Sequence, residues 1–214
     1  MIEPTDKIGR ITLYNADCME VMKTFKDKQF DLAIVDPPYG INFSNTHTGK
    51  GWIVRDNKTW DSKRPNKTYF DELFRISKNQ IIWGGNYFVE YLYSSPGWIF
   101  WDKGQRNFSL ADGELAFTSF NRALRTFYLS RAKLNSIREK FHPTEKPVQL
   151  YEWLLLNYAK EGEKILDTHF GSLSIGIACE KLGFELTAIE LDKDYYRMAK
   201  QRLLNFKKQL TIEF

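Results

Sequence analysis

Residues 30–39 of this chain read FDLAIVDPPY, and the rest of the fold is organised around them. The first six are mostly apolar and include β-branched side chains, which is typical of a strand buried in a parallel sheet. Pro37 and Pro38 then end the strand, because neither has an amide hydrogen to donate to a sheet. The stretch therefore predicts that Asp36 and Tyr39 lie at the carboxyl end of a strand, the edge of an α/β sheet where ligands bind.

The residue types at this strand end suit an exocyclic amino group. Asp36 and the Pro37 carbonyl are hydrogen-bond acceptors, and such an amine offers two N–H donors. Tyr39 adds a flat face on which a base ring can stack. An aromatic amine is a poor nucleophile because its lone pair is delocalised, and acceptors for both hydrogens favour the pyramidal nitrogen that can attack. The alternative is an ordinary Asx-Pro turn, and these four residues alone do not decide between the two.

Composition and charge limit the class of protein. The chain has 214 residues, of which 43% are hydrophobic, enough for one domain with a sizeable core and short for two. A net charge of +4 is compatible with a polyanionic partner. Cys18 and Cys179 show no metal-ligand or redox spacing, so reduced thiols in a cytosolic compartment are expected. No secretory leader and no run of 18 apolar residues is present, so neither secretion nor a membrane span is expected.

Segments with strand and helix patterns alternate along the chain. Strands are expected at about residues 11–14, 30–35, 80–83, 97–102, 114–120, 164–167 and 185–189. Helices are expected at about residues 18–25, 69–76, 87–93, 148–159, 175–182 and 192–206. This alternation predicts an α/β fold with a mainly parallel sheet that has helices on both faces.

A second site signal lies between residues 164 and 190. A strand ending at Asp167 is followed by a turn with Gly171, then a helix, then a strand that ends in Glu190. This order and spacing are typical of a nucleotide-binding βαβ unit, in which the turn approaches the ligand and the second acid binds ribose hydroxyls. The signal is moderate, because no second glycine follows Gly171 in the usual place. Asp17 also ends a strand, where a helix cap and a ligand contact are equally expected.

Two stretches are basic and have no clear period. Residues 42–67 contain six lysines and arginines against two aspartates, with Trp52 and Trp60 among them. Residues 121–141 contain six lysines and arginines against Glu139 alone. Either stretch could hold nucleic-acid phosphates and bases, and the alternatives are a solvated lid and a solvated face.

Taken together, these motifs resemble the β class of amino-group DNA methyltransferases, whose catalytic motif precedes the cofactor motif. The resemblance covers nearly the whole chain and is carried by four short segments: NADC at 15–18, DPPY at 36–39, HPTEKP at 142–147 and LDTHFGS at 166–172. Each is modest alone, but unrelated chains would rarely combine all four in this order. The resemblance implies a permuted, Rossmann-like methyltransferase fold in a single domain, residues 1–214, with S-adenosyl-L-methionine as cofactor.

The resemblance also implies residue roles. The residues that would hold the flipped target base are Asp36, Pro37, Pro38 and Tyr39. The residues that would bind the cofactor are Asp17, Thr144, Lys146, Asp167, His169, Gly171, Ser172 and Glu190. Among these, Asp17 would meet the adenine amine, Glu190 the ribose, and Lys146, helped by Thr144, the methionyl carboxylate. His142 and His169 receive no proton-transfer role.

The activity implied is methylation of N6 of adenine in DNA, within a restriction-modification setting and in the cytoplasm of a bacterium or of a phage host. No metal is needed, because the sulfonium leaving group departs neutral. The nearest rival is N4 methylation of cytosine, although an initial aspartate in the DPPY motif leans toward adenine within the family. RNA and a protein glutamine are further rival substrates. A catalytically impaired nucleic-acid-binding relative is a rival of another class, and a nicotinamide dehydrogenase is disfavoured because G-x-G-x-x-G is absent.

The sequence departs from the family pattern in two places. Leu173 stands where glycine is usual, which predicts a less close approach of backbone to cofactor and would support the impaired relative. The segment available for reading DNA, residues 121–141, is short. It predicts a small DNA footprint, a homodimer, or help from residues 42–67.

Overall fold

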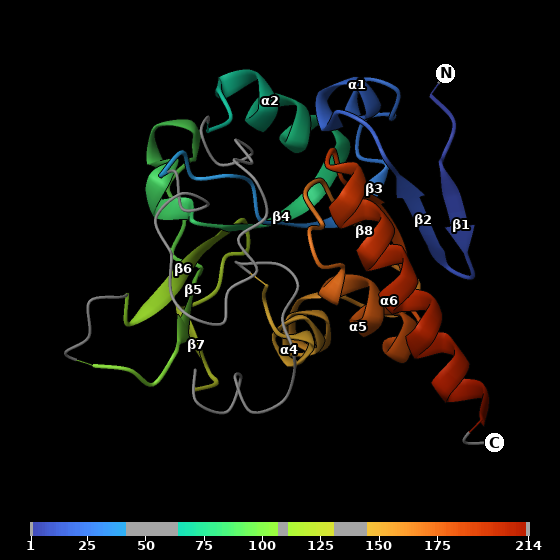
Figure 1. Ribbon diagram of the computed structural model, residues 1–214. Helices are drawn as coiled ribbons and strands as arrows, with labels where there is room; N and C mark the ends of the chain where they lie inside the picture. The colour runs from blue at the N-terminus through green and yellow to red at the C-terminus, as the bar shows by residue number, and fades with distance from the viewer. Residues whose placement is uncertain (1, 42–63, 107–110, 131–144, 213–214) are drawn as a thin grey trace.

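The computed structural model describes residues 2–41, 64–106, 111–130 and 145–212, and the described strands form one nine-stranded sheet (Figure 1). The sheet order is β1-β2-β9-β8-β3-β4-β6-β5-β7. The strands are β1 (Asp6–Ile8), β2 (Ile11–Tyr14), β3 (Phe30–Val35), β4 (Ser77–Trp83), β5 (Trp98–Asp102), β6 (Gly113–Thr118), β7 (Arg125–Tyr128), β8 (Lys164–Asp167) and β9 (Glu185–Ile189). From β2 to β4 every neighbouring pair is parallel, and β6 then joins β4 and β5 with antiparallel pairing. The predicted mainly parallel α/β sheet is confirmed.

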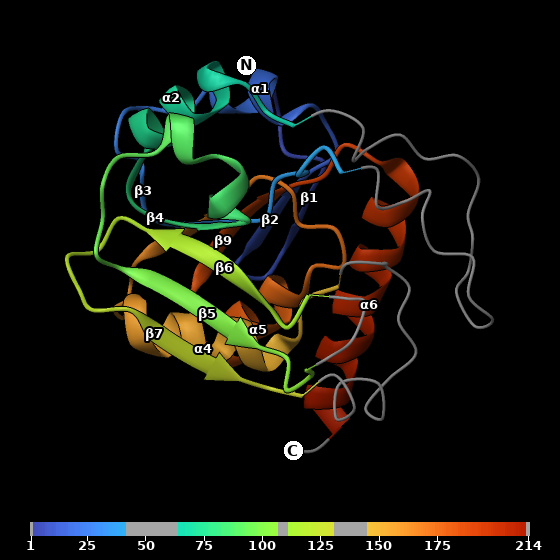
Figure 2. The same cartoon turned by 90° about the vertical axis from the view of Figure 1, so that its left-hand side faces the viewer.

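Helices cover both faces of the sheet. The helices are α1 (Cys18–Met22), α2 (Lys67–Ile76), α4 (Val148–Tyr158), α5 (Ser174–Leu182) and α6 (Lys193–Ile212), with short 3₁₀ turns η2 (Gly85–Tyr87) and η3 (Val89–Tyr91). One buried cluster joins the sheet to α1 and α2, and the other joins it to α4, α5 and α6. Figure 2 shows α1 and α2 above the sheet, and α4 and α5 below it. No helix in the described part of the chain is long and apolar enough to cross a bilayer.

Strand β3 lies at the centre of this arrangement, between β8 and β4. Leu32 and Ile34 belong to one buried cluster, and Ala33 and Val35 belong to the other. Each of the four is at most 1% exposed. Burial on both faces is the reason that residues 30–35 form an almost continuous apolar run.

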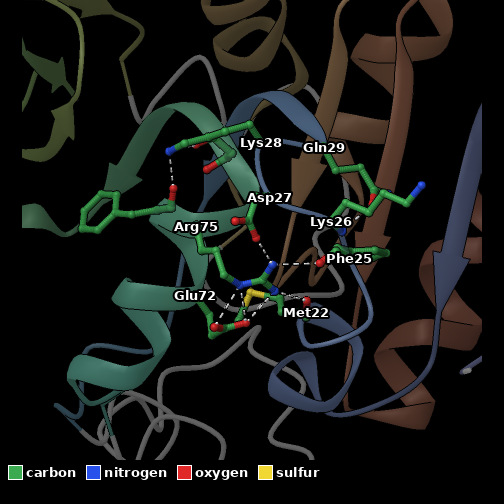
Figure 3. Close-up of polar contacts among 10 residues, drawn as sticks. Met22, Phe25, Lys26, Asp27, Lys28, Gln29, Glu72 and Arg75 are labelled. Carbon is green, nitrogen blue, oxygen red and sulfur yellow. Dashed lines mark hydrogen bonds and ion pairs between the residues drawn. The ribbon is translucent and has the colours of Figure 1, made fainter.

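Arg75 fastens the end of α1 to α2 (Figure 3). Its guanidinium donates to the carbonyl oxygens of Met22 at 3.1 Å and Phe25 at 2.9 Å, and it pairs with Asp27 and Glu72. Met22 is the last residue of α1 and Phe25 follows it by three residues, so the planar donor group of Arg75 holds the helix end and the turn after it at once. This contact fixes the segment that leads from α1 into β3.

Some expectations from the sequence are wrong in detail. Residues 87–93, expected as a helix, form the turns η2 and η3, where Tyr87 N–H donates to the Gly84 carbonyl at 2.8 Å in an i to i+3 bond. Gly84 has a left-handed backbone (φ 67°), and this geometry favours a short 3₁₀ piece over a regular helix. Residue 67, placed in the basic loop, is the first residue of α2. The remaining loop residues 42–63, with both tryptophans, lie outside the described residues.

The basic stretch 121–141 contains a strand that was not predicted. Residues 125–128 form β7, which pairs in parallel with β5 at the edge of the sheet. The sequence Arg-Thr-Phe-Tyr has residues that favour strands, but it lies in a window whose charges obscure the alternation. Residues 131–141 lie outside the described part of the chain.

Candidate active site

The site lies where the connections of the sheet diverge. From β3 the chain passes through α2 to β4 on one side, and from β8 it passes through α5 to β9 on the other. In an open α/β sheet, such a switch point leaves a crevice outside the carboxyl ends of the strands. Ala33 pairs with Leu166, so Asp36 and Asp167 follow neighbouring strand ends. The structure therefore brings the predicted base-binding and cofactor-binding residues to the same edge of the sheet.

Asp36 is held in a fixed orientation by Tyr39. The Tyr39 hydroxyl donates to Asp36 Oδ1 at 2.6 Å. Burial, and then the charge of Asp36, raise the pKa of Tyr39 well above its usual range, so the phenol remains a donor. The Tyr39 ring stacks on Tyr87, with ring centroids 5.0 Å apart and planes inclined by 15°. Gly84 lies against the same ring, because a Cβ on it would come within 2.2 Å of Tyr39. Between Asp36 and Tyr39, Pro37 is buried and Pro38 half-buried.

Lys146 holds the other oxygen of Asp36. Its Nζ lies 2.5 Å from Asp36 Oδ2 and 3.1 Å from Glu114 Oε2, and its side chain is 3% exposed. Burial alone would lower the pKa of Lys146, but the two carboxylates outweigh that effect and raise it. The ammonium also lies over the Trp83 ring, 5.2 Å from its centroid. The structure thus places Lys146 on the Asp36 carboxylate, whereas the sequence resemblance linked it to the cofactor. Thr144 lies outside the described residues.

The glycine turn after β8 is tied to the end of β9. Gly171 N–H donates to Glu190 Oε2, and Asp192 N–H donates to Glu190 Oε1, both at 2.9 Å. Gly171 has a positive φ of 48°, which a glycine adopts without strain. Burial raises the pKa of Glu190 to about 7, although the backbone donors oppose this rise. A carboxylate accepts about four hydrogen bonds, so Glu190 keeps capacity for a hydroxyl-bearing ligand.

Asp167 begins the turn as a deeply buried carboxyl group, 1% exposed. Burial raises its pKa to about 8; the hydrogen bond from His169 N–H at 3.0 Å opposes this, and the charges of Asp36 and Glu190 reinforce it. Asp167 is therefore a buried acid at the end of β8 whose pKa is affected by the charges of both Asp36 and Glu190.

Asp17 and His169 have clear structural partners. Asp17 Oδ1 accepts a hydrogen bond from Met19 N–H at 2.7 Å, which caps α1, and the Asp17 side chain remains exposed. His169 lies with Nδ1 2.9 Å from Thr168 Oγ1 and Nε2 3.7 Å from the Cys18 sulfur. Burial lowers the pKa of His169 to about 4, so its ring is neutral. These contacts agree with a positioning role for His169 rather than proton transfer.

Leu173 adopts the backbone conformation that a glycine would adopt. Its φ and ψ are 57° and 32°, and its side chain is 0% exposed. The side chain packs over Gly176, where a Cβ would come within 2.7 Å of Leu173 Cγ. A left-handed non-glycine residue costs about 1–2 kcal/mol, and burial of the leucine side chain in the core offsets that cost. The turn geometry is therefore kept, and the leucine side chain lies in the core.

Sequence reasoning missed two charged residues that support the site. Glu114, on β6, pairs with Lys146 and with Lys103. Arg202, on α6, donates to the Ser172 carbonyl at 2.7 Å and pairs with Glu145 at 3.0 Å, which joins the glycine turn to the residue before Lys146. Glu114 gave a weak signal, because it is an acid within an apolar strand. Arg202 gave none, because a basic residue on a long amphipathic helix is usually solvated.

Comparison with known proteins shows which family the chain is similar to. The DNA methylase family model matches residues 100–201. The type II methyltransferase M.HpaI of Haemophilus parainfluenzae is 26% identical over 235 aligned positions, which cover 88% of this chain and 72% of that protein. Among solved structures, the M1.HpyAVI–SAM complex has a TM-score of 0.61 at 21% identity, over 90% of this chain and 99% of that one. The cytosine-N4-specific PvuII DNA methyltransferase has a TM-score of 0.63 at 12% identity, over 97% and 94%.

These likenesses bear on the fold and on the family separately. The structural neighbours confirm the Rossmann-like methyltransferase fold. The family model and the curated relative add sequence similarity that the fold alone would not give. These findings support an amino-group DNA methyltransferase family for this chain, because its sequence is similar to the DNA methylase family model over residues 100–201 and to type II methyltransferases.

Proposed function

We propose that this protein transfers a methyl group from S-adenosyl-L-methionine to N6 of adenine in DNA. The observation that carries the proposal is the position of Asp36, whose two oxygens are held by Tyr39 and Lys146. It lies at the same crevice as Asp167 and Glu190. An acceptor suited to a base amine and a glycine turn suited to a nucleotide thus lie at the same edge of the sheet, at the ends of β3 and β8.

The residues of the turn fit the adenosine part of the cofactor. The Glu190 carboxylate lies at the tip of β9, already oriented by two backbone N–H groups, and can accept hydrogen bonds from ribose hydroxyls. Asn15 donates to the Glu190 carbonyl at 2.8 Å, which brings the tip of β2, and Asp17 just beyond it, beside this acceptor. When bound, the cofactor supplies a methyl group activated by a positively charged sulfur. The protein itself has to orient that group and exclude water.

The base amine is bound by the other half of the crevice. Asp36 can accept an N–H of the amine and stabilise the positive charge that develops on its nitrogen. Tyr39 and Tyr87 form a stacked aromatic pair next to this acceptor, and Tyr87 is 39% exposed. We infer that this pair supplies the apolar surface against which the flipped base rests. Within the described residues no group of three or more potential metal ligands is present.

The direct test is long-read sequencing of DNA from cells that express the protein. We expect N6-methyladenine in one short sequence context, and a much lower methylated fraction of those sites in cells that express the Asp36→Asn variant at the same level. N4-methylcytosine in the same data, without N6-methyladenine, would show that the substrate is cytosine and not adenine. Absence of both modified bases, with folded protein present in the cells, would refute DNA methylation.

Cofactor binding is expected to depend on pH through Glu190. Its pKa of about 7 means that the carboxyl group is protonated at low pH and becomes a charged, stronger acceptor as the pH rises. The dissociation constant of S-adenosyl-L-methionine should therefore fall up to about tenfold between about pH 6 and pH 8. Isothermal titration calorimetry measures this directly. The Glu190→Gln variant should bind more weakly and lose this slope, and a slope that persists unchanged in it would exclude Glu190 as the cause.

A further inference from the structure

A chain of five polar side chains extends from the base-binding residues into the sheet. Tyr39 donates to Asp36, Asp36 pairs with Lys146, Lys146 pairs with Glu114, and Glu114 pairs with Lys103. The five come from distant parts of the sequence: the end of β3, the end of β5, the start of β6 and the segment before α4. Such an arrangement of alternating charges is costly to bury unless each member is paired.

The charges in this chain create a problem for the proposed chemistry. Asp36 must stabilise positive charge on the attacked nitrogen, but the Lys146 ammonium lies 2.5 Å from one of its oxygens. An isolated Asp36–Lys146 pair is neutral overall and would stabilise that charge weakly. Glu114 lies 3.1 Å from the same ammonium, so the three side chains together carry one negative charge.

Glu114 is suited to this task because it stays ionised. Burial tends to raise the pKa of Glu114, but Lys146 and Lys103 outweigh that effect and lower it to about 2. The three side chains are largely removed from water, with exposed fractions of 3% for Lys146, 18% for Asp36 and 26% for Glu114. At low exposure, charges interact more strongly than in water, so the loss of one changes the field felt at Asp36.

We propose that Glu114 is a positioning residue of the methyl-transfer site: it balances the Lys146 ammonium, so that Lys146 can anchor Asp36 without cancelling the charge of Asp36. This inference rests on the proposed function and adds to it a residue that touches neither substrate nor cofactor. Lys103 is the outer member of the chain and has the opposite effect. Its ammonium pairs with Glu114 and lies 4.8 Å from the centroid of the Trp101 ring.

The field at the transferred methyl can be measured without DNA. Sinefungin carries an amine, protonated at neutral pH, in place of the sulfonium and its methyl group, and S-adenosylhomocysteine carries a neutral sulfur there. The ratio of their dissociation constants, measured by isothermal titration calorimetry, reports the negative potential next to Asp36. Glu114→Gln should reduce the preference for sinefungin about tenfold, while the affinity for S-adenosylhomocysteine changes little.

Three further variants make the test specific. Lys103→Gln should raise the preference for sinefungin, because it removes a positive charge that offsets the charge of Glu114. A purely structural role would not give opposite signs for the two changes. Asp112→Asn is the matched control, since Asp112 is exposed and lies just before β6, and the substitution removes the same charge as Glu114→Gln. Its preference should equal that of the wild type. Glu114→Asp keeps the charge and should retain most of the preference.

The outcomes separate this inference from the proposed function. A preference within twofold of the wild type in both Glu114→Gln and Lys103→Gln would overturn the role of Glu114. If Glu114→Gln does not fold, the rise expected for Lys103→Gln decides the question alone. Failure to methylate DNA would be seen in the sequencing experiment and would not alter the binding ratio. In an active enzyme, Glu114→Gln should lower kcat about tenfold and leave the KM values for DNA and cofactor within twofold.

Discussion

Replacing Asp36 with asparagine is expected to lower kcat by about 10²–10³-fold, because the transition state loses the charge that stabilises the attacked nitrogen. Asparagine has nearly the same shape and can still accept the hydrogen bond from Tyr39. Lys146 keeps Glu114 as a partner, so the buried ammonium is not left without a counter-charge. Single-turnover methylation of a DNA that carries the recognition context, with saturating cofactor, gives the rate.

Two controls accompany this prediction: the cofactor affinity of the same variant, and the activity of a variant at another acid of the same strand. The dissociation constant of S-adenosyl-L-methionine should change little in Asp36→Asn, because the turn at Gly171 and Glu190 is unaltered. Asp31→Asn changes the other acid of the same segment, at the opposite end of β3, where Asp31 pairs with Lys78. That variant should retain wild-type kcat. Full activity in Asp36→Asn would mean that another group accepts the amine.

The second large effect is expected from Gly84→Ala. Gly84 has φ of 67°, and an added Cβ would lie 2.2 Å from the Tyr39 ring. The methyl group must displace Tyr39, and with it the hydrogen bond that orients Asp36. The left-handed backbone costs about 1–2 kcal/mol for alanine, and the clash adds about 1–3 kcal/mol of overpacking. We therefore expect a clear fall in the melting temperature together with a loss of kcat of more than about tenfold.

Gly162→Ala provides a matched control for the backbone effect. Gly162 also has a positive φ, 82°, but no atom lies within 4 Å of the position of its Cβ. This variant should show the backbone cost alone, about 1–2 kcal/mol in the free energy of unfolding, with kcat unchanged. Urea unfolding of both variants measures the difference. Equal destabilisation and equal activity in the two would show that Tyr39 does not depend on the space above Gly84.

The sequence predicted the parts of the fold that depend on neighbouring residues. The apolar run 30–35 marked a strand buried on both faces, and the two prolines marked its end. For Asp17 the sequence indicated a helix cap or a ligand contact, and the structure shows it as the cap of α1, because capping is a property of one residue and its nearest backbone groups. The same local signals placed Asp36, Asp167 and Glu190 at strand ends.

The order of the segments also predicted which residues could meet. Parallel strands have their carboxyl ends at one edge, so any site residue that ends such a strand lies near the others. The position of the crevice between β3 and β8 still required the sheet order, which places two strands 130 residues apart in the chain next to each other.

What the sequence by itself determined was most of the strands and the acids at their tips, because these follow from the chemistry of adjacent residues; β1 and β7 were not among the strands expected. Only the tertiary structure decided that Lys146 contacts Asp36, that Glu114 balances it, and that Arg202 joins the glycine turn to the segment before α4. A lysine or glutamate looks the same in a sequence whether it is solvated or buried in a pair. Its partner is chosen by packing between distant segments, and burial then makes the pair strong enough to matter.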